Sequence, residues 1–508
     1  MNTKRVRVRF APSPTGPLHM GGVRTALFNY LFAKKNNGDF ILRIEDTDRA
    51  RYVPGTEEYI IESLLWCNIN IDEGVTKGGE YGPYHQSKRK DIYQKYADLL
   101  IESGNAYYAF DTTDELDKLR KEYESKKEKF TYCAQNRSLL KNSLSFSKDE
   151  TQRRIDAGEE YVIRFKIPEN EELKFYDIIR KEVIVNTSTL DDKILFKSDG
   201  MPTYHLANVV DDYLMKISHV IRGEEWLPSL PLHVLLYRSL GWGNEMPEFA
   251  HLPLLLKPDG KGKLSKRDGD RLGFPVFPIE WKSPSGEIYP GYRESGYFPE
   301  AFVNMIAFLG WNPGTEREIF SLDELINEFS LEKVGKSGAK FDPDKAKWFN
   351  HYYLQKKDDI ELASLFQPIL KGKGVEVSDE YVEKLCGLLK ERVNFVSELW
   401  DQSHYFFIAP TVYDEKIIQK KWKDDTPIIL SELKEKLSTI EEFKAEDIEK
   451  VFKDFLEEKN LRMGDVMNVL RLVLVGSNVG PGLFLIAELL GKDEVAKRID
   501  NGIKEIKT

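Results

Sequence analysis

The 508-residue sequence contains only three cysteines, Cys67, Cys133 and Cys386, and they lie far apart. An odd number of scattered cysteines argues against a disulfide framework and is typical of a reducing compartment, so we expect a cytoplasmic protein. No apolar run reaches the roughly 18 residues that a transmembrane helix needs, and we expect no membrane span. A strand pattern begins directly after the N-terminal residues, which predicts no signal peptide.

There is also no excess of positive charge, because 74 Lys/Arg are outnumbered by 84 Asp/Glu and the formal net charge is −10. This balance argues against a surface that is basic throughout, as phosphate contacts would favour. The charge is uneven, however: residues 1–51 carry ten Lys/Arg and four Asp/Glu, net +6, which leaves −16 for the rest. We therefore expect a basic track on one face and acidic surface elsewhere, which is compatible with RNA binding but does not establish it.

The N-terminal segment predicts a strand, a turn and a helix. Apolar and basic residues alternate over Arg5–Phe10, as in a strand. Pro12 and Pro14 end the pattern because proline donates no ladder hydrogen bond. A helix is predicted after Gly21 and Gly22, from an apolar stripe that comprises Val23, Ala26, Leu27, Tyr30 and Leu31.

His19 precedes this predicted helix by about one turn and is a candidate donor to a phosphate or ribose oxygen. Gly22 would let a ligand approach the backbone, and free N–H groups at a helix start favour anionic phosphate. Taken alone, a histidine beside two glycines is more often an ordinary turn residue.

A second segment, Lys257–Arg267, is rich in glycine and lysine. Most short basic runs are solvated surface loops. The alternative is a loop that closes over a triphosphate and neutralises the charge that develops as pyrophosphate leaves. Lys263, Lys266 and Arg267 are the candidate cations.

Together the two segments resemble the HIGH and KMSKS signatures of class I aminoacyl-tRNA synthetases. The first is His19-Met-Gly-Gly22 and the second is Lys263-Leu-Ser-Lys-Arg267. The runs Ala11-Pro-Ser-Pro-Thr-Gly16, Arg43-Ile-Glu-Asp-Thr-Asp48 and Pro202–Asp212 are similar to bacterial-type glutamyl-tRNA synthetases. The resemblance is dense over the first 270 residues and thinner beyond residue 300. One departure is that Gly22 stands where the signature has its second histidine.

The resemblance implies a glutamate site and an ATP site. A carboxylate substrate favours arginine and its ammonium favours a carboxylate; Arg222 and Glu45 each end a predicted strand, where ligands bind in open α/β sheets. The glutamate pocket is expected to comprise Arg9, Ala11, Ser13, Glu45, Tyr204, Asn208 and Arg222. The ATP site is expected to comprise His19, Gly21, Gly22, Glu225, Leu256, Lys263, Leu264, Ser265, Lys266 and Arg267. Among these, His19, Lys263, Lys266 and Arg267 are the expected catalytic residues.

The predicted fold is α/β, with a Rossmann-type class I catalytic core, an inserted α+β domain that binds the tRNA acceptor end, and an all-α C-terminal region. Strands are predicted near Val6–Phe10, Phe40–Ile44 and Ser218–Ile221. The predicted parts are core halves at 1–101 and 205–273, an insertion at 102–204, a stem-contact region at 274–355 and a helical anticodon-binding region at 356–508. The stretch 274–295 reads as an added hairpin or loop, with Ser-Pro-Ser-Gly at its turn.

The implied reaction joins L-glutamate to ATP as glutamyl-adenylate and then transfers glutamate to the 3′ end of tRNA-Glu. ATP is expected with Mg²⁺, held largely by phosphates and water. We predict no protein metal site and no structural zinc, because Cys133 stands alone where some relatives carry paired cysteines. A monomer is expected.

Three alternatives remain. The first is an enzyme that also charges tRNA-Gln. The second is a glutaminyl-tRNA synthetase or a short tRNA-modifying relative, which the Pro-Ser-Pro-Thr-Gly run and the helical C-terminal third disfavour, respectively. The third is a catalytically silent RNA-binding paralogue, which would be expected to lose the lysine loop or the pocket arginines.

Overall fold

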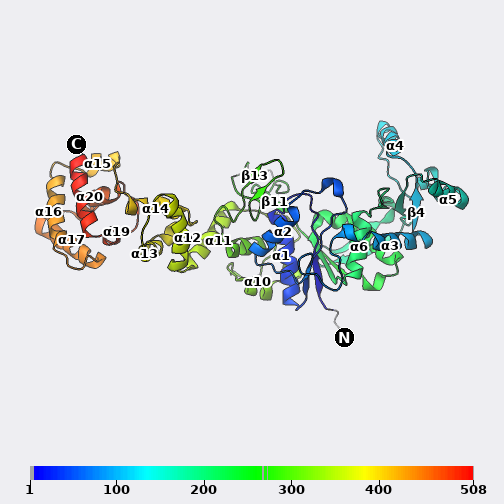
Figure 1. Cartoon of the computed structure of the whole chain (residues 1–508), viewed down its shortest axis with the longest axis horizontal. Helices are drawn as coiled ribbons and strands as arrows, with labels where there is room; N and C mark the ends of the chain where they lie inside the picture. The colour runs from blue at the N-terminus through cyan, green and yellow to red at the C-terminus, as the bar shows by residue number, and fades with distance from the viewer. Residues whose placement is uncertain (1–4, 266–267, 270, 272, 507–508) are drawn as a thin grey trace. The chain divides into compact units, whose positions relative to one another are not determined.

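The computed structural model describes residues 5–265, 268–269, 271 and 273–506. The chain divides into two compact units, Met1–Ala346 and Lys347–Thr508, and each is described by itself (Figure 1). Lys266 and Arg267 of the predicted lysine loop lie outside the described residues.

The core of the first unit is built from two sheets of mainly parallel strands. One has the order β1-β2-β3 and the other β7-β6-β10-β9. Their strands are β1 (Arg7–Phe10), β2 (Asp39–Leu42), β3 (Glu73–Gly74), β6 (Glu172–Asp177), β7 (Lys181–Asn186), β9 (His219–Gly223) and β10 (Glu248–Leu252). All pairs are parallel except the antiparallel pair β6–β7.

Ser218 joins the two sheets at β1 and β9. Its N–H donates to the Arg7 carbonyl at 2.9 Å, and the Arg7 N–H donates to Ser218 Oγ at 2.8 Å. β1 and β9 thus lie side by side, while their sequence neighbours β2 and β10 extend to opposite sides. Such a reversal of strand order leaves a crevice at the carboxyl ends of the strands, where ligands bind in open α/β sheets.

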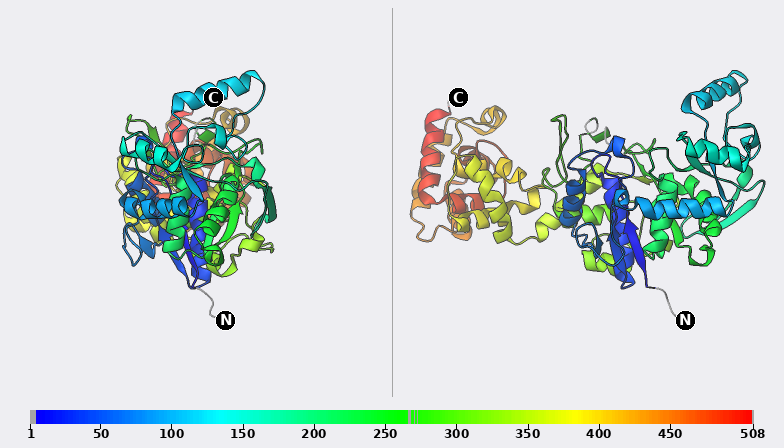
Figure 2. Two further views of the ribbon diagram at one scale, coloured as in Figure 1. Left: turned by 90° about the vertical axis from the view of Figure 1, so that its right-hand side faces the viewer. Right: turned by 45° about the vertical axis from the view of Figure 1, so that its right-hand side comes forward.

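Helices cover this core, and α1 (Met20–Lys35) is the one that follows β1 (Figures 1 and 2). The predicted stripe of α1 is buried, and Phe28 and Asn29 on its other side are buried too. The remaining α-helices described in this unit are α2 (Thr56–Trp66), α3 (Lys90–Glu102), α4 (Thr113–Ser125), α5 (Lys148–Asp156), α6 (Tyr204–Leu214), α7 (Leu230–Ser239), α9 (Pro299–Ala307) and α10 (Leu322–Glu328). Ser321 caps α10, and Glu324 completes a capping box.

The alternation in β1 does not mark a solvated face, since all four residues of this strand are buried. Arg7 donates to Asp39 and Glu73, at 2.9 Å each, and Arg9 pairs with Asp212. A parallel strand inside a doubly covered sheet is buried on both faces. Its basic residues are therefore paired inside the protein.

The predicted insertion has a small sheet of its own. It has the order β4-β5-β8 and comprises β4 (Ala106–Ala109), β5 (Val162–Phe165) and β8 (Ile194–Phe196). The other two strands of the predicted insertion, β6 and β7, belong to the core sheet instead, because Asp177 of β6 pairs with Phe249 of β10.

The stretch after the lysine loop contains the predicted hairpin. β12 (Trp281–Lys282) and β13 (Ile288–Tyr289) pair antiparallel around a turn in which Gly286 has φ of +88°. A second short pair, β11 (Leu255–Leu256) with β14 (Ala339–Lys340), is parallel.

Residues 347–506 contain helices and no strand, as the yellow-to-red ribbon of Figure 2 shows. α11 (Pro343–Lys356) contains the division between the units. The helices that follow are α12 (Asp359–Gly372), α13 (Asp379–Leu389), α14 (Glu398–Phe407), α15 (Glu415–Lys421), α16 (Thr426–Ser438), α17 (Ala445–Lys459), α18 (Met463–Val475), α19 (Leu483–Leu490) and α20 (Lys492–Glu505). Residues 439–444 form a break between α16 and α17. Within the described residues, no helix is long and apolar enough to cross a bilayer.

Candidate functional site

A cleft of about 670 Å³ opens at the carboxyl ends of β1, β2, β9 and β10. It is lined by fourteen of the predicted site residues: Arg9, Ala11, Ser13, His19, Gly21, Gly22, Glu45, Tyr204, Asn208, Arg222, Glu225, Lys263, Leu264 and Ser265. Leu256 does not line it; its side chain lies against Gly338, and the neighbouring Leu255 takes that place. The fold therefore brings together segments separated by up to about 250 residues.

His19 is the N-cap of α1, so the helix begins one residue after it rather than after the two glycines. The Gly21 N–H donates to His19 Nδ1 at 2.9 Å. An acceptor Nδ1 carries no proton, so the neutral ring holds its proton on Nε2. That tautomer makes His19 a donor within the cleft.

The helix N-terminus offers fewer open N–H groups to a phosphate than predicted. The Met20 N–H donates to the Val276 carbonyl at 2.8 Å, and the Gly21 N–H is taken by His19. Both glycines are needed for close packing: a Cβ on Gly21 would lie 2.7 Å from His19 Cε1, and one on Gly22 would lie 2.3 Å from Leu18 Cδ1. They shape the histidine turn as well as the cleft wall.

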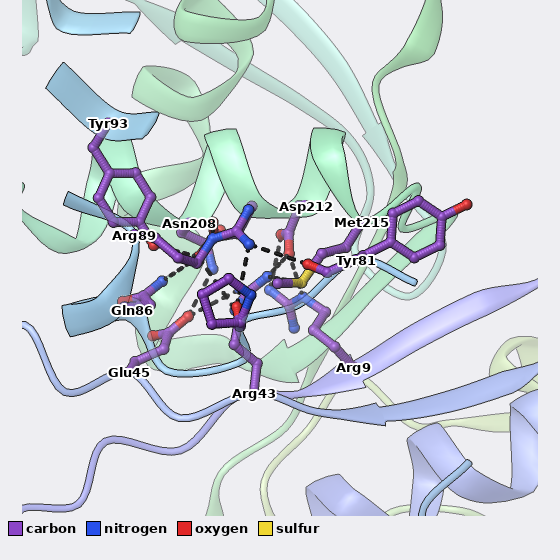
Figure 3. Close-up of polar contacts among 12 residues, drawn as sticks. Arg9, Arg43, Glu45, Tyr81, Gln86, Arg89, Tyr93, Asn208, Asp212 and Met215 are labelled. Atoms are coloured by element: carbon purple, nitrogen blue, oxygen red, sulfur yellow. Dashed lines mark hydrogen bonds and ion pairs between the residues drawn. The ribbon is translucent and has the colours of Figure 1, made fainter. Parts of the chain in front are cut away.

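A buried charge network holds Arg9 at the floor of the cleft (Figure 3). Arg9 donates to both carboxylate oxygens of Asp212, from Nε at 3.0 Å and Nη2 at 3.2 Å, and Arg43 Nη1 donates to Asp212 at 2.8 Å. Burial by itself would raise the pKa of Asp212, but the two arginines lower it. Asp212 is therefore ionised and fixes the plane of the Arg9 guanidinium.

Glu45 contributes a negative charge to the same cleft and shares the Arg43 guanidinium with Asp212 (Figure 3). Its Oε1 accepts from Arg43 Nη2 at 3.0 Å and from Asn208 Nδ2 at 3.3 Å. Burial raises the pKa of Glu45, and Arg43 and Arg9 oppose that shift. A substrate ammonium in contact with Glu45 would favour its charged form further.

Arg222, at the end of β9, lies in the cleft with each of its nitrogens hydrogen-bonded. Nε donates to His251 Nε2 at 3.0 Å, Nη1 to the Tyr204 hydroxyl at 2.8 Å and Nη2 to the Trp226 carbonyl at 3.4 Å. The Tyr204 and Trp226 rings pack against each other in a tilted arrangement, with 4.3 Å between their centroids. None of the described contacts of Arg222 is a carboxylate, so its charge is available to an anionic ligand.

The described part of the lysine loop is held by two carboxylates. Lys263 Nζ lies 3.1 Å from Glu225 Oε1. Asp268 Oδ2 accepts from the Ser265 N–H at 2.9 Å and from Ser265 Oγ at 2.6 Å. The bond from Ser265, followed by the attraction of Lys257, lowers the pKa of Asp268 to about 2.

Sequence reasoning missed several cleft residues. Arg24 is buried in the first turn of α1 and donates to the Pro253 and Leu309 carbonyls. Burial lowers its pKa to about 10, so it stays charged at neutral pH. A lone arginine inside the apolar pattern of α1 was the available signal. Arg51 and Lys197 also line the cleft, from exposed segments that carried no motif.

The cleft favours anions. Six arginine and lysine side chains line it, against three aspartates and glutamates. Among the described residues, no group of three or more His, Cys, Asp or Glu is placed to hold a metal ion. Asp48 caps a short helix, η1 (Arg49–Arg51), and Asp46 accepts from Ser87, so both carboxylates have structural partners. The excess of positive charge suits a ligand with several negative charges, bound beside a small molecule that carries both an ammonium and a carboxylate.

The sequence matches two family models. Residues 5–348 match the catalytic domain of class I tRNA synthetases for glutamate and glutamine, and residues 361–503 match an anticodon-binding domain. These matches confirm the predicted fold class, with a class I catalytic region and a helical C-terminal region.

Full-length relatives agree. The chain is 58% identical to a glutamate–tRNA ligase of Parabacteroides distasonis over 100% of both chains, and 58% identical to one of Christiangramia forsetii over 99% of this chain and 100% of that one. A crystal structure of a glutamate tRNA ligase from Elizabethkingia meningosepticum, in complex with its amino acid, superposes with a TM-score of 0.97 at 52% identity and covers 99% of this chain and 100% of its own. The chain therefore belongs to the glutamate–tRNA ligase family of class I aminoacyl-tRNA synthetases.

Proposed function

We propose that this chain activates L-glutamate with ATP in the cleft of its first unit and transfers it to the 3′ end of tRNA-Glu. The observation that carries the proposal is the charge pattern of the pocket. Arg222 has no carboxylate among its described contacts, and Glu45 lies in the same cleft as a fixed anion. An amino acid with a second carboxylate complements both.

In this pose the γ-carboxylate of glutamate binds Arg222 and the Tyr204 hydroxyl, and the α-ammonium binds Glu45. Arg9 adds a positive charge to the cleft and Asn208 a polar amide, while Ala11 and Ser13 form the adjacent wall of the cleft. Glutamine would place a neutral amide against a buried arginine. Sites of this kind reject a wrong side chain by about 10⁴-fold or more without editing.

ATP, as its magnesium complex, occupies the end of the cleft next to His19 and the lysine loop. His19 donates from Nε2 to a phosphate or ribose oxygen, and Gly21, Gly22, Glu225 and Leu264 form the surroundings. Lys263 neutralises developing charge on the phosphates, and the sequence assigns the same task to Lys266 and Arg267. No resident metal is required, because phosphates and water coordinate most of the Mg²⁺.

The reaction needs no side-chain nucleophile. An oxygen of the α-carboxylate of glutamate attacks the α-phosphorus of ATP, the bond between that phosphorus and the bridging oxygen of the β-phosphate breaks, and pyrophosphate leaves with the electron pair. A ribose hydroxyl of the terminal adenosine then attacks the carbonyl of the adenylate, and AMP leaves. Positioning and preorganised charge lower both barriers.

The test is Arg222→Ala, assayed by the charging of tRNA-Glu with labelled glutamate. We expect the KM for glutamate to rise by at least about a hundredfold, because a charged hydrogen-bonding partner is lost. Arg238→Ala is the matched control, since Arg238 pairs with Glu171 on the surface and does not line the cleft. Normal charging by Arg222→Ala would overturn the pocket assignment.

A further inference from the structure

A buried aspartate–histidine pair lies directly behind Arg222. Asp177 ends β6 and His251 belongs to β10, and both side chains are fully buried. His251 Nδ1 lies 2.6 Å from Asp177 Oδ2, while Asp177 Oδ1 accepts from the N–H groups of Ile179 and Arg180 at 2.9 and 2.8 Å. Neither residue lines the cleft, and the proposed reaction does not use them.

The hydrogen bonds assign the protons of this pair. Burial by itself would raise the pKa of Asp177, but His251 and the backbone N–H groups lower it, so this carboxylate is ionised and can only accept. The ring proton of His251 therefore lies on Nδ1. Because Arg222 Nε donates to Nε2 at 3.0 Å, Nε2 keeps its lone pair and the ring is neutral. Burial lowers the pKa of His251, which agrees with a neutral ring.

The same bond fixes the orientation of the Arg222 guanidinium. Nε is held from behind by His251, and the two Nη groups are directed towards Tyr204 and Trp226 at the cleft wall. Arginine binds a carboxylate through two parallel N–H groups only when its plane is correctly turned. At metal sites, the buried partners that orient a ligating side chain contribute about ten- to a hundredfold to affinity, and we expect a similar range for an oriented arginine.

We propose that Asp177 and His251 are positioning residues that turn Arg222 towards the γ-carboxylate of glutamate and so set the preference for glutamate over glutamine. This inference rests on the proposed function, in which Arg222 binds that carboxylate. Asp177 acts by fixing the tautomer of His251, and His251 acts by accepting from Arg222.

Two substitutions test the separate roles of His251 and Asp177. His251→Leu removes the acceptor and leaves Arg222 Nε without a partner there. Asp177→Asn keeps the carbonyl oxygen for Ile179 and Arg180 and turns its amide towards His251. That amide donates to Nδ1, so the ring proton moves to Nε2 and faces the Arg222 N–H. Both variants should raise the KM for glutamate about ten- to a hundredfold and leave the KM for ATP unchanged. They should also lower the ratio of kcat/KM for glutamate to kcat/KM for glutamine.

A pair of conservative variants separates orientation from packing. His251→Gln places an oxygen near the position of Nε2 and should largely restore the KM for glutamate. His251→Asn matches the position of Nδ1 but is too short to reach Arg222, so it should resemble His251→Leu. Asp192→Asn is the control for Asp177→Asn, because Asp192 is an equally buried carboxylate that bonds Tyr107 and Ile167 and does not line the cleft.

The readout is the charging of tRNA-Glu at varied glutamate and varied ATP, for the full-length enzyme and each variant. The proposal is overturned if His251→Gln and His251→Asn behave alike. It is also overturned if Asp177→Asn and His251→Leu change the KM for glutamate and the KM for ATP equally. Arg222→Ala separates a failure of the proposed pocket from a failure of the positioning role of Asp177 and His251. If Arg222→Ala charges normally, the proposed pocket is wrong; if it fails while the Asp177 and His251 variants keep the wild-type KM for glutamate, only this inference is wrong.

Discussion

Asp212 is the residue whose neutralisation should damage the first unit most directly. It is the shared acceptor of Arg9 and Arg43, through three hydrogen bonds of 2.8–3.2 Å, and all three side chains are almost fully buried. Asp212→Asn keeps the shape but leaves two guanidinium groups with one fewer counter-charge. Breaking a buried ion pair on one side costs about 3–5 kcal/mol, so we expect the free energy of unfolding of this unit to fall by that amount.

Asp212→Asn should also change how the stability of the protein depends on pH under acidic conditions. The folded-state pKa of Asp212 lies below its ordinary value, because the two arginines outweigh burial. A carboxylate with a depressed folded pKa stabilises the protein above its unfolded pKa of about 3.9, and this contribution is lost as the pH falls further. The wild-type protein should therefore lose stability below about pH 4 more steeply than Asp212→Asn.

Urea unfolding followed by tryptophan fluorescence measures both effects. Asp117→Asn is the control, since Asp117 and Arg120 form an exposed pair on α4 that should contribute at most about 1 kcal/mol. If Asp212→Asn loses no more stability than Asp117→Asn, the buried network does not hold Arg9 in the way described.

Two further predictions concern the ATP end of the cleft. His19→Asn keeps an acceptor for the Gly21 N–H and should keep the stability of the protein, whereas His19→Ala should lose about 0.5–2 kcal/mol of cap stabilisation. Both variants should slow adenylate formation. Equal thermal midpoints for His19→Asn and His19→Ala would refute the cap assignment. Asp268→Ala releases Ser265 and Lys257, so it should lower the single-turnover rate of adenylate formation with little change in the KM for glutamate. Asp259→Ala, in the same loop, is its control, because among the described residues Asp259 accepts only from the Lys261 N–H. Equal rates for Asp268→Ala and Asp259→Ala would contradict a role for Asp268.

The sequence predicted the elements that carry local signals. Alternation located β1, and the apolar stripe located α1. The candidate pocket residues followed from motif resemblance, and most of them meet in one cleft because the carboxyl ends of parallel strands share an edge.

The partners of these residues could not be predicted in the same way. Asp212 is distant in sequence from both Arg9 and Arg43, and only the packing of α6 against the core sheet brings them together. Asp177 was predicted as part of the insertion, yet β6 joins the core sheet and delivers it to His251. Pairings of this kind depend on topology, and no local pattern encodes them. The start of α1 was predicted after Gly21 and Gly22, whereas the helix begins at Met20, because His19 caps it from a position that propensity does not favour.

The most direct test of the account is the parallel charging of tRNA-Glu and tRNA-Gln with labelled glutamate and labelled glutamine, in the presence of ATP and magnesium. We predict that tRNA-Glu is charged with glutamate and that glutamine is rejected by about 10⁴-fold or more. Charging of tRNA-Gln with glutamate would mean that the helical unit tolerates both anticodons, while the pocket assignment would stand. Charging with glutamine, or with neither amino acid, would contradict a pocket built around Arg222.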